Sequence, residues 1–316
     1  MLTVLLALVC NVVLRTPDLK VGPTIQVRPQ VEPLVPIGIW YGGPGAQPPE
    51  MQVSDLETVK SELAIIRRAG FNSITTWVTW RDAEPKRGAY VLAGVERLIA
   101  LAAQSDLRVD VRIFTDTPPA WSSAVPGDRA RFITYAVSRL RLSAHITSVE
   151  AADGSERANT IRVGRNARTP IEARVDFWTA IARGAQTVTF MDAEGGVGPS
   201  VLSLGETIGI VTRNPALFAP LRVRMAGIRE ISGGSGPPVE VRLLESPDAL
   251  VILGINFSPN VQKTTINFTP DIPEAIWQNL ETSTSVNFVM GPNGPFLEHT
   301  FSPRDTLVLM IRKKLR

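Results

Sequence analysis

Over residues 34–230, two patterns of apolar residues alternate along the chain. Short apolar runs bounded by Pro or Gly predict buried strands, and apolar residues spaced three and four apart predict amphipathic helices. The predicted strands are 35–41, 71–78, 107–114, 144–149 and 186–191. The predicted helices are 54–70, 92–103, 126–140 and 170–182, followed by a Pro-interrupted helical stretch to about 228. Because strand-then-helix units repeat, the pattern predicts a parallel sheet of five strands.

Two helix starts have a capping-box pattern, in which a hydroxyl residue is followed three residues later by Glu. These are Ser54 with Glu57 and Thr169 with Glu172. In the second box Pro170 occupies the first helical position, where its missing N–H group costs nothing.

The pattern of apolar and turn residues changes after a Gly-, Ser- and Pro-rich linker at 233–238. Short strand patterns separated by turn residues fill the segment 239–316. They are expected at 239–244, 250–255, 263–268, 275–278, 285–289, 297–301 and 306–311. Such spacing is typical of an antiparallel β-sandwich. The expected organisation is thus a strand–helix domain over 34–230 and a β-sandwich domain over 239–316.

The first 15 residues form an apolar leader, followed by a Pro-rich linker over 16–33. The apolar run is shorter than the roughly 20 residues that span a bilayer, and it resembles the apolar region of a secretory signal. It lacks a basic start and an obvious cleavage site. The leader therefore predicts a secreted, periplasmic or cell-envelope protein, with a stray hydrophobic start as the alternative.

Composition excludes several classes of function. One cysteine, Cys10, and two histidines argue against a Cys/His metal site, which takes three or four such ligands. The net charge of +3 comes partly from the basic tail 312–316, and no stripe of basic and aromatic residues suggests nucleic-acid binding. No glycine loop has the spacing that cradles phosphates, so no cofactor is expected.

Four stretches in order resemble family-42-type glycoside hydrolases, which are β-galactosidase-like. The first is 70–90, with Gly-Phe-Asn, then Trp, then Glu-Pro-x-x-Gly-x-Tyr; the second is 115–121, Thr-Asp-Thr-Pro-Pro-Ala-Trp. The third, 148–154, is similar to the segment that holds the nucleophile after the seventh strand of the family. The fourth, 174–190, is similar to the seventh helix and eighth strand.

The resemblance implies a (β/α)8 barrel whose active site lies at the carboxyl ends of its strands. It implies that Glu150 is the catalytic nucleophile and that a galactoside or related oligosaccharide is the partner. Substrate contacts are expected from residues that follow predicted strands, namely Tyr41, Trp80, Asp116 and Trp121. Asp192 and Glu194 also follow a strand, whereas Glu84 is expected to fix its loop rather than to bind sugar.

One part of the family pattern is missing. The acid/base glutamate of the family follows an asparagine after the fourth strand, and this sequence contains no Asn-Glu pair. Only residues 141–149 separate Leu140 from Glu150, so strands four to six are expected to be deleted there. Such an incomplete barrel has open edges, which a homo-oligomer could cover. Retaining hydrolysis would lack its proton donor, which predicts an impaired glycosidase or, alternatively, a non-catalytic carbohydrate-binding module.

Overall fold

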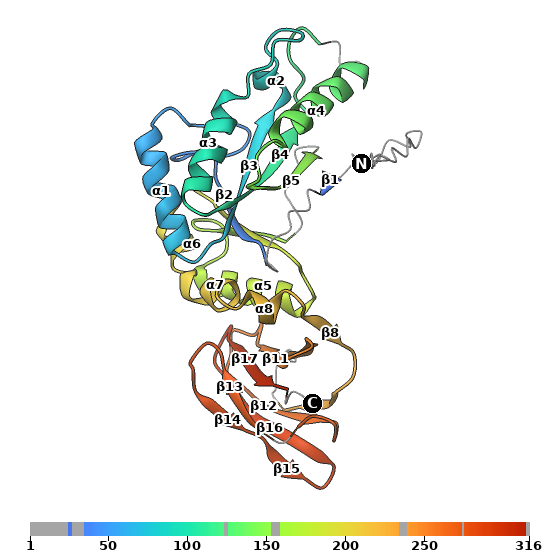
Figure 1. The fold of residues 1–316 in the computed structure, drawn as a ribbon. Helices are drawn as coiled ribbons and strands as arrows, with labels where there is room; N and C mark the ends of the chain where they lie inside the picture. Colours follow the sequence, from blue (N-terminus) through green and yellow to red (C-terminus); the bar gives the residue numbers. More distant parts are fainter. Residues whose placement is uncertain are drawn as a thin grey trace, which may run out of the picture.

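The computed structural model describes residues 25–26, 35–122, 126–152, 159–233, 239–273 and 275–313. The predicted leader and nearly all of both predicted linkers lie outside these residues. The chain forms two consecutive parts, first a parallel sheet with helices and then a pair of antiparallel sheets (Figure 1). None of the helices in the described ranges is long and apolar enough to cross a bilayer.

The first sheet has six parallel strands in the described part of the chain, one more than the sequence predicts. They are β2 (Ile37–Trp40), β3 (Ser73–Thr79), β4 (Arg108–Phe114), β5 (Ile146–Ala152), β6 (Thr160–Val163) and β7 (Val188–Asp192). Their order is β5-β4-β3-β2-β7-β6, and every pair among them is parallel. The strand missed from the sequence is β6, which has only four residues.

This order assigns each strand a place in a barrel. In a closed eight-stranded barrel the first strand lies between the second and the eighth. Since β2 lies between β3 and β7, β7 takes the eighth place, β6 the seventh and β5, beside β4, the fourth. Among the described residues, the fifth and sixth strands of the barrel therefore have no counterpart. The expected deletion before Glu150 is wrong, because the gap falls between β5 and β6.

The open edge of β5 carries an additional strand. β1 (Ile25–Gln26) pairs antiparallel with β5, with Ile25 opposite Val149 and Gln26 opposite Ser148. The edge that a second chain could cover is thus partly covered by residues 25–26 of the same chain.

Helices begin and end largely where the sequence indicates. They are α1 (Leu56–Arg68), α2 (Trp80–Ala83), α3 (Ala93–Gln104), α4 (Pro126–Leu140), α5 (Pro170–Ala182), α6 (Pro199–Leu202), α7 (Gly205–Thr212) and α8 (Pro215–Phe218). The Thr169–Glu172 capping box is present in full. At α1 the cap is Asp55 rather than Ser54, and its side chain accepts a hydrogen bond from the Thr58 backbone N–H.

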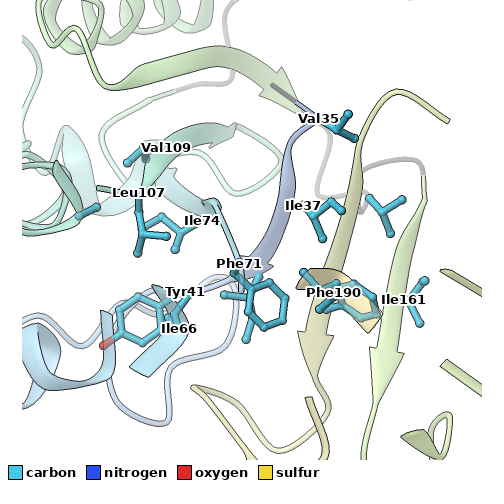
Figure 2. Close-up of a cluster of buried hydrophobic side chains, with 14 of the residues drawn as sticks. Val35, Ile37, Tyr41, Ile66, Phe71, Ile74, Leu107, Val109, Ile161 and Phe190 are labelled. Atoms are coloured by element: carbon cyan, nitrogen blue, oxygen red, sulfur yellow. The ribbon is translucent and has the colours of Figure 1, made fainter. Parts of the chain in front are cut away.

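The main core lies between the parallel sheet and its helices. Strand residues alternate between two faces, so that Ile37 and Ile39, like Val109 and Val111, point to the helix-facing core. Figure 2 shows Ile37 of this core beside Phe71 and Phe190, whose rings meet edge to face at 5.9 Å. The alternate strand residues point to the opposite, inner face of the sheet.

The second part is a β-sandwich. One sheet contains β8 (Arg222–Arg224), β10 (Glu240–Glu245), β11 (Ala249–Ile255), β17 (Thr306–Arg312), β13 (Ile276–Asn279) and β14 (Ser285–Asn287). The other contains β9 (Ile228–Ser232), β12 (Gln262–Phe268), β16 (Gly294–Phe301) and β15 (Val289–Gly291). Apolar residues of both sheets form one core around Trp277 and Phe268. β8 comes from the stretch whose Pro-interrupted pattern predicted a helix, and both β8 and β9 begin before the predicted start of the sandwich at residue 239.

The sandwich packs against α5 of the barrel part, and Figure 1 shows α5, α7 and α8 between the two. Val251 and Leu253 of β11 belong to the main core together with Phe177. Trp178 donates a hydrogen bond from Nε1 to Glu281 Oε1 at 2.9 Å, and Arg174 forms an ion pair with Asp305 at 3.1 Å. These contacts join the two parts through one continuous core.

Candidate active-site pole

A hollow lies at the carboxyl ends of β3 and β4. Its volume is about 120 Å³, and it is lined by the end residues of the two strands, the residues that follow them, and a Pro-Pro pair: Pro48, Pro49, Thr79, Arg81, Phe114, Asp116 and Thr117. Parallel α/β barrels bind their ligands at this pole, because the loops after the strands converge there. The hollow is therefore a candidate ligand site at the carboxyl pole of the sheet.

Polar groups on one side of the hollow are tied to each other. Thr79 Oγ1 donates to Asp82 Oδ2 at 2.5 Å, and Arg81 pairs with Asp82 Oδ1 at 3.1 Å. Burial acts to raise the pKa of Asp82, but the hydrogen bonds from Thr79 and Arg81 outweigh it and hold that pKa below its usual value. This side of the hollow thus has a fixed hydroxyl and a fixed guanidinium.

Asp116, predicted to contact substrate, lines the hollow and is exposed. Within the described part of the chain its carboxylate accepts no hydrogen bond. It is therefore available to hydrogen-bond a ligand hydroxyl or to attract a cation.

Tyr41 does not lie at the pole, contrary to the prediction. Its side chain is fully buried in the helix-facing core beside Ile66, as Figure 2 shows, and its hydroxyl donates to Glu62 Oε2 of α1 at 2.8 Å. Burial and the Glu62 carboxylate raise the pKa of Tyr41 far above its usual value. A ring with no exposed face cannot stack on a sugar, so the expected contact is wrong.

Trp80 is also buried, with 1% of its surface exposed. Its ring stacks on Phe132 of α4 at 6.0 Å, and its Nε1 donates to Glu84 Oε2 at 2.8 Å. The structure therefore assigns Trp80 to the packing of α2 on α4 rather than to substrate contact.

Trp121 is half-buried and lies edge to face on Trp80 at 6.2 Å. Its Nε1 donates to the Glu84 carbonyl oxygen at 2.7 Å, and the Arg87 guanidinium lies 5.9 Å from its ring centre. Trp121 does not line the hollow. Its contact with sugar stays a prediction, for a ligand that extends beyond the hollow.

Glu84 fixes its loop, as the sequence analysis predicts. The side chain is fully buried and accepts hydrogen bonds from Trp80 Nε1, from the Gly88 backbone N–H at 2.8 Å and from Arg131 Nη2 at 3.2 Å. A buried carboxylate needs such partners to offset its lost hydration. The Glu-Pro-x-x-Gly motif is therefore a structural one in this chain.

Glu150 lies on the inner face of β5, opposite Arg112 of β4. Arg112 Nη1 and Glu150 Oε2 form an ion pair at 2.5 Å, with 10% and 18% of the two side chains exposed. One pleat toward the amino ends of the strands, Ser148 Oγ donates to Asp110 Oδ1 at 2.6 Å. The inner face thus carries paired polar groups where closed barrels pack branched apolar residues.

The predicted place of Glu150 in the barrel is wrong. The match to a seventh strand placed the nucleophile there, but β5 pairs with β4 and takes the fourth place. The strand in the seventh place, β6, ends in Val163 and is followed by Gly164, so it presents no carboxylate at its end. Retaining hydrolysis needs two carboxyl groups roughly 5–5.5 Å apart. Such a pair is not present at the ends of β5 and β6 in the described residues.

Asp192 and Glu194 lie at the other side of the pole. Asp192 ends β7 and is buried, and its Oδ1 accepts a hydrogen bond from the Glu194 backbone N–H at 2.9 Å. The Glu194 side chain is exposed. In the sheet, β2, β3 and β4 separate Asp192 from Glu150. Because its carboxylate accepts the Glu194 N–H, Asp192 stabilises the loop that follows β7, at a distance from Glu150.

Several residues of the pole were not predicted from the sequence. Thr79, Arg81 and Phe114 line the hollow, and Arg112 pairs with Glu150. The available signal was position, because Phe114 ends a predicted strand and Thr79 and Arg81 follow one. For Arg112 the signal was a charged residue inside an alternating strand, which is rarely buried without a partner.

Residues 49–132 match the model of glycoside hydrolase family 42, described as beta-galactosidase. This match confirms the predicted resemblance over that segment. It also covers every residue that lines the hollow except Pro48. The search of curated proteins finds no match to the chain.

Solved structures of sugar-processing enzymes have a similar fold. An alpha-amylase from Geobacillus thermoleovorans, complexed with acarbose, aligns with a TM-score of 0.59 at 10% identity, over 89% of this chain and 99% of that chain. A chain described as a glycoside hydrolase aligns with a TM-score of 0.58 at 10% identity, over 88% and 92%. A family 39 glycoside hydrolase from the gut symbiont Bacteroides cellulosilyticus WH2 aligns with a TM-score of 0.51 at 9% identity, over 88% and 81%. At these identities the likeness shows the fold: an incomplete glycosidase-type barrel followed by antiparallel sheets.

Proposed function

We propose that this glycoside-hydrolase-related chain binds a β-galactoside or a related sugar in the hollow at the carboxyl ends of β3 and β4, and that its retaining hydrolysis is impaired. The observation that carries the proposal is the coincidence of the hollow with residues 49–132, the segment that matches the β-galactosidase family. Hydroxyl groups of Thr79 and Thr117 and the Asp116 carboxylate supply hydrogen-bonding partners for sugar hydroxyls.

Impairment is supported by the positions of the carboxyl groups. Glu150 is held in an ion pair with Arg112, and in the described residues no second carboxyl group lies beside it at the ends of β5 and β6. Without a positioned acid, the departing sugar oxygen loses a contribution of typically 10²–10⁴-fold in rate. Substrates with good leaving groups need less protonation, so aryl galactosides are the substrates most expected to retain some turnover.

Binding is tested by titrating the full chain with galactose and lactose in a calorimeter. We expect saturable binding that Asp116→Ala weakens and Asp248→Ala, a matched change on an exposed turn of the sandwich, does not. Absence of binding at millimolar sugar, or equal binding by both variants, would reject the hollow as the site.

Hydrolysis is tested in parallel with p-nitrophenyl β-galactoside and with lactose. We expect turnover of the aryl galactoside to be slow and turnover of lactose to be slower still. Any residual turnover is expected to fall in Glu150→Gln, with circular dichroism used to check that this variant is folded. Efficient hydrolysis of lactose would overturn the proposed impairment.

We also propose, on the basis of the sequence, that the protein is exported and that it self-associates. Export is proposed on the leader alone, and cell fractionation with N-terminal sequencing of the mature chain tests it. Self-association is proposed for the part of the β5 edge that β1 leaves uncovered, and sedimentation of the purified chain tests it.

A further inference from the structure

Acidic side chains outnumber basic ones around the hollow. Asp116 lines it, and Asp82 and Glu50 interact with the lining residue Arg81. Asp82, which hydrogen-bonds Arg81, and more weakly Glu50 hold the pKa of that guanidinium above its usual value. The hollow thus has one lining carboxylate, Asp116, and one lining guanidinium, and two further carboxylates act on that guanidinium, although the net charge of the chain is +3.

The single cation is already compensated. Arg81 pairs with Asp82 at 3.1 Å, and Asp82 is held in place by Thr79. The Asp116 carboxylate, in contrast, accepts no hydrogen bond from the described residues. The negative charge that a ligand meets in the hollow is therefore that of Asp116.

The remaining lining favours a cation that is attached to an apolar ring. Pro48 and Pro49 give the hollow an apolar wall beside Phe114, whose side chain is largely buried. Pyranose rings have apolar C–H faces that pack on such surfaces, while their substituents reach polar groups. A volume of about 120 Å³ leaves room for the end of one sugar unit rather than for a chain of sugars.

We propose that the preferred ligand of this hollow is an amino sugar with a free, protonated amine, whose ammonium group pairs with Asp116. This proposal rests on the proposed sugar-binding function and narrows its ligand class. An acetylated amine carries no charge and loses the pairing, and a uronic acid is repelled.

The test compares four probes by calorimetry at about pH 6, where an amine with a pKa of roughly 7.7–8.0 is protonated. The probes are galactosamine, galactose, N-acetylgalactosamine and ethanolamine. Exposed ion pairs contribute at most about 1 kcal/mol, so galactosamine is expected to bind up to about fivefold more tightly than galactose. At about 1 M NaCl the Debye length is near 3 Å and the preference is expected to disappear.

Variants assign the preference to one carboxylate. In Asp116→Asn the ratio of the galactose and galactosamine dissociation constants is expected to fall to about one, whatever the affinity for galactose becomes. In the matched control Asp248→Asn the ratio is expected to stay as in the wild type. The salt titration of the wild-type chain tests the same point without any variant.

The outcomes separate this inference from the function on which it rests. Equal binding of galactose and galactosamine, or a preference that salt does not reduce, overturns the amino-sugar proposal and leaves sugar binding intact. Ethanolamine binding as tightly as galactosamine shows a simple cation site and also overturns it. Failure of all the sugars to bind rejects the proposed function itself.

Discussion

The ion pair between Arg112 and Glu150 gives the sharpest prediction about the barrel interior. Arg112→Met removes the guanidinium and keeps most of the apolar length of the side chain. The Glu150 carboxylate, with 18% of its side chain exposed, then loses the guanidinium that lies 2.5 Å from it. Removing one partner of a buried pair costs about 3–5 kcal/mol, and partial exposure places this pair at about 3 kcal/mol.

The assay is urea unfolding followed by far-ultraviolet circular dichroism. We expect Arg112→Met to lower the unfolding free energy by about 3 kcal/mol, which corresponds to a melting temperature about 5–10 °C lower. The double variant Arg112→Met/Glu150→Leu replaces both charges with apolar groups and is expected to recover most of the loss. The coupling energy of this cycle should therefore be about 2–3 kcal/mol.

A matched control comes from an exposed pair. Arg67 and Asp106 are 2.9 Å apart, with 43% and 84% of their side chains exposed. Arg67→Met is expected to cost no more than about 1 kcal/mol. The reasoning is refuted if Arg112→Met costs as little as Arg67→Met, or if the double variant is as unstable as the sum of its single changes.

Three further variants test separate parts of the account. Glu84→Ala should cost about 3–5 kcal/mol in urea unfolding, because it removes the acceptor of three hydrogen bonds in a fully buried site; a loss below about 1 kcal/mol would contradict the loop-fixing role. Asn72→Ala should cost about 3 kcal/mol, because Asn72 Oδ1 accepts from the Ile37 N–H and its Nδ2 donates to the Val35 carbonyl, both at 2.9 Å. Asn293→Ala, a change at an exposed residue, is the control. Equal losses of unfolding free energy in the two variants would show that the two hydrogen bonds of the Asn72 side chain do not stabilise the fold. Burial lowers the pKa of His299 in the folded protein. The neutral imidazole therefore contributes its full stabilisation above the unfolded-state pKa of about 6.5. This stabilisation is lost as the pH falls through the pKa of the folded state. His299→Gln should therefore make unfolding less sensitive to acid between about pH 7 and pH 5, and an unchanged acid sensitivity would argue against burial of this histidine.

Local features of the fold were predictable because their causes are local. The Thr169–Glu172 box, the end of α4 at Leu140 and most sandwich strands follow from capping, periodicity and turn residues within a few positions. The structural role of Glu84 was also predictable, because a carboxylate inside a Pro- and Gly-containing loop has nearby backbone donors.

The place of a strand in the sheet was not predictable in the same way. Pairing of β5 with β4 joins residues about 38 positions apart, as Arg112 and Glu150 are, and no local pattern determines that partner. β6 was missed because four residues with Ile161 and Val163 alternating are too short a signal. The resemblance of residues 148–154 to a seventh-strand segment placed Glu150 there, and the missed β6 left no other strand for that place.

The error at Tyr41 had a signal in the sequence. Ile37, Ile39 and Tyr41 have the same parity, and side chains two apart in a strand share a face. All three lie in the helix-facing core. Aromatic residues after a strand therefore need to be sorted by parity before they are assigned to a sugar site.

The most direct test of the central claim is a crystal structure of the full chain soaked with galactose. The account predicts electron density for one sugar unit in the hollow lined by Thr79, Phe114 and Asp116, with its hydroxyl groups within hydrogen-bonding distance of Asp116. It also predicts that the Arg112–Glu150 pair stays closed beneath it. Density at another surface, or a sugar held between Glu150 and a second carboxyl group, would contradict the account.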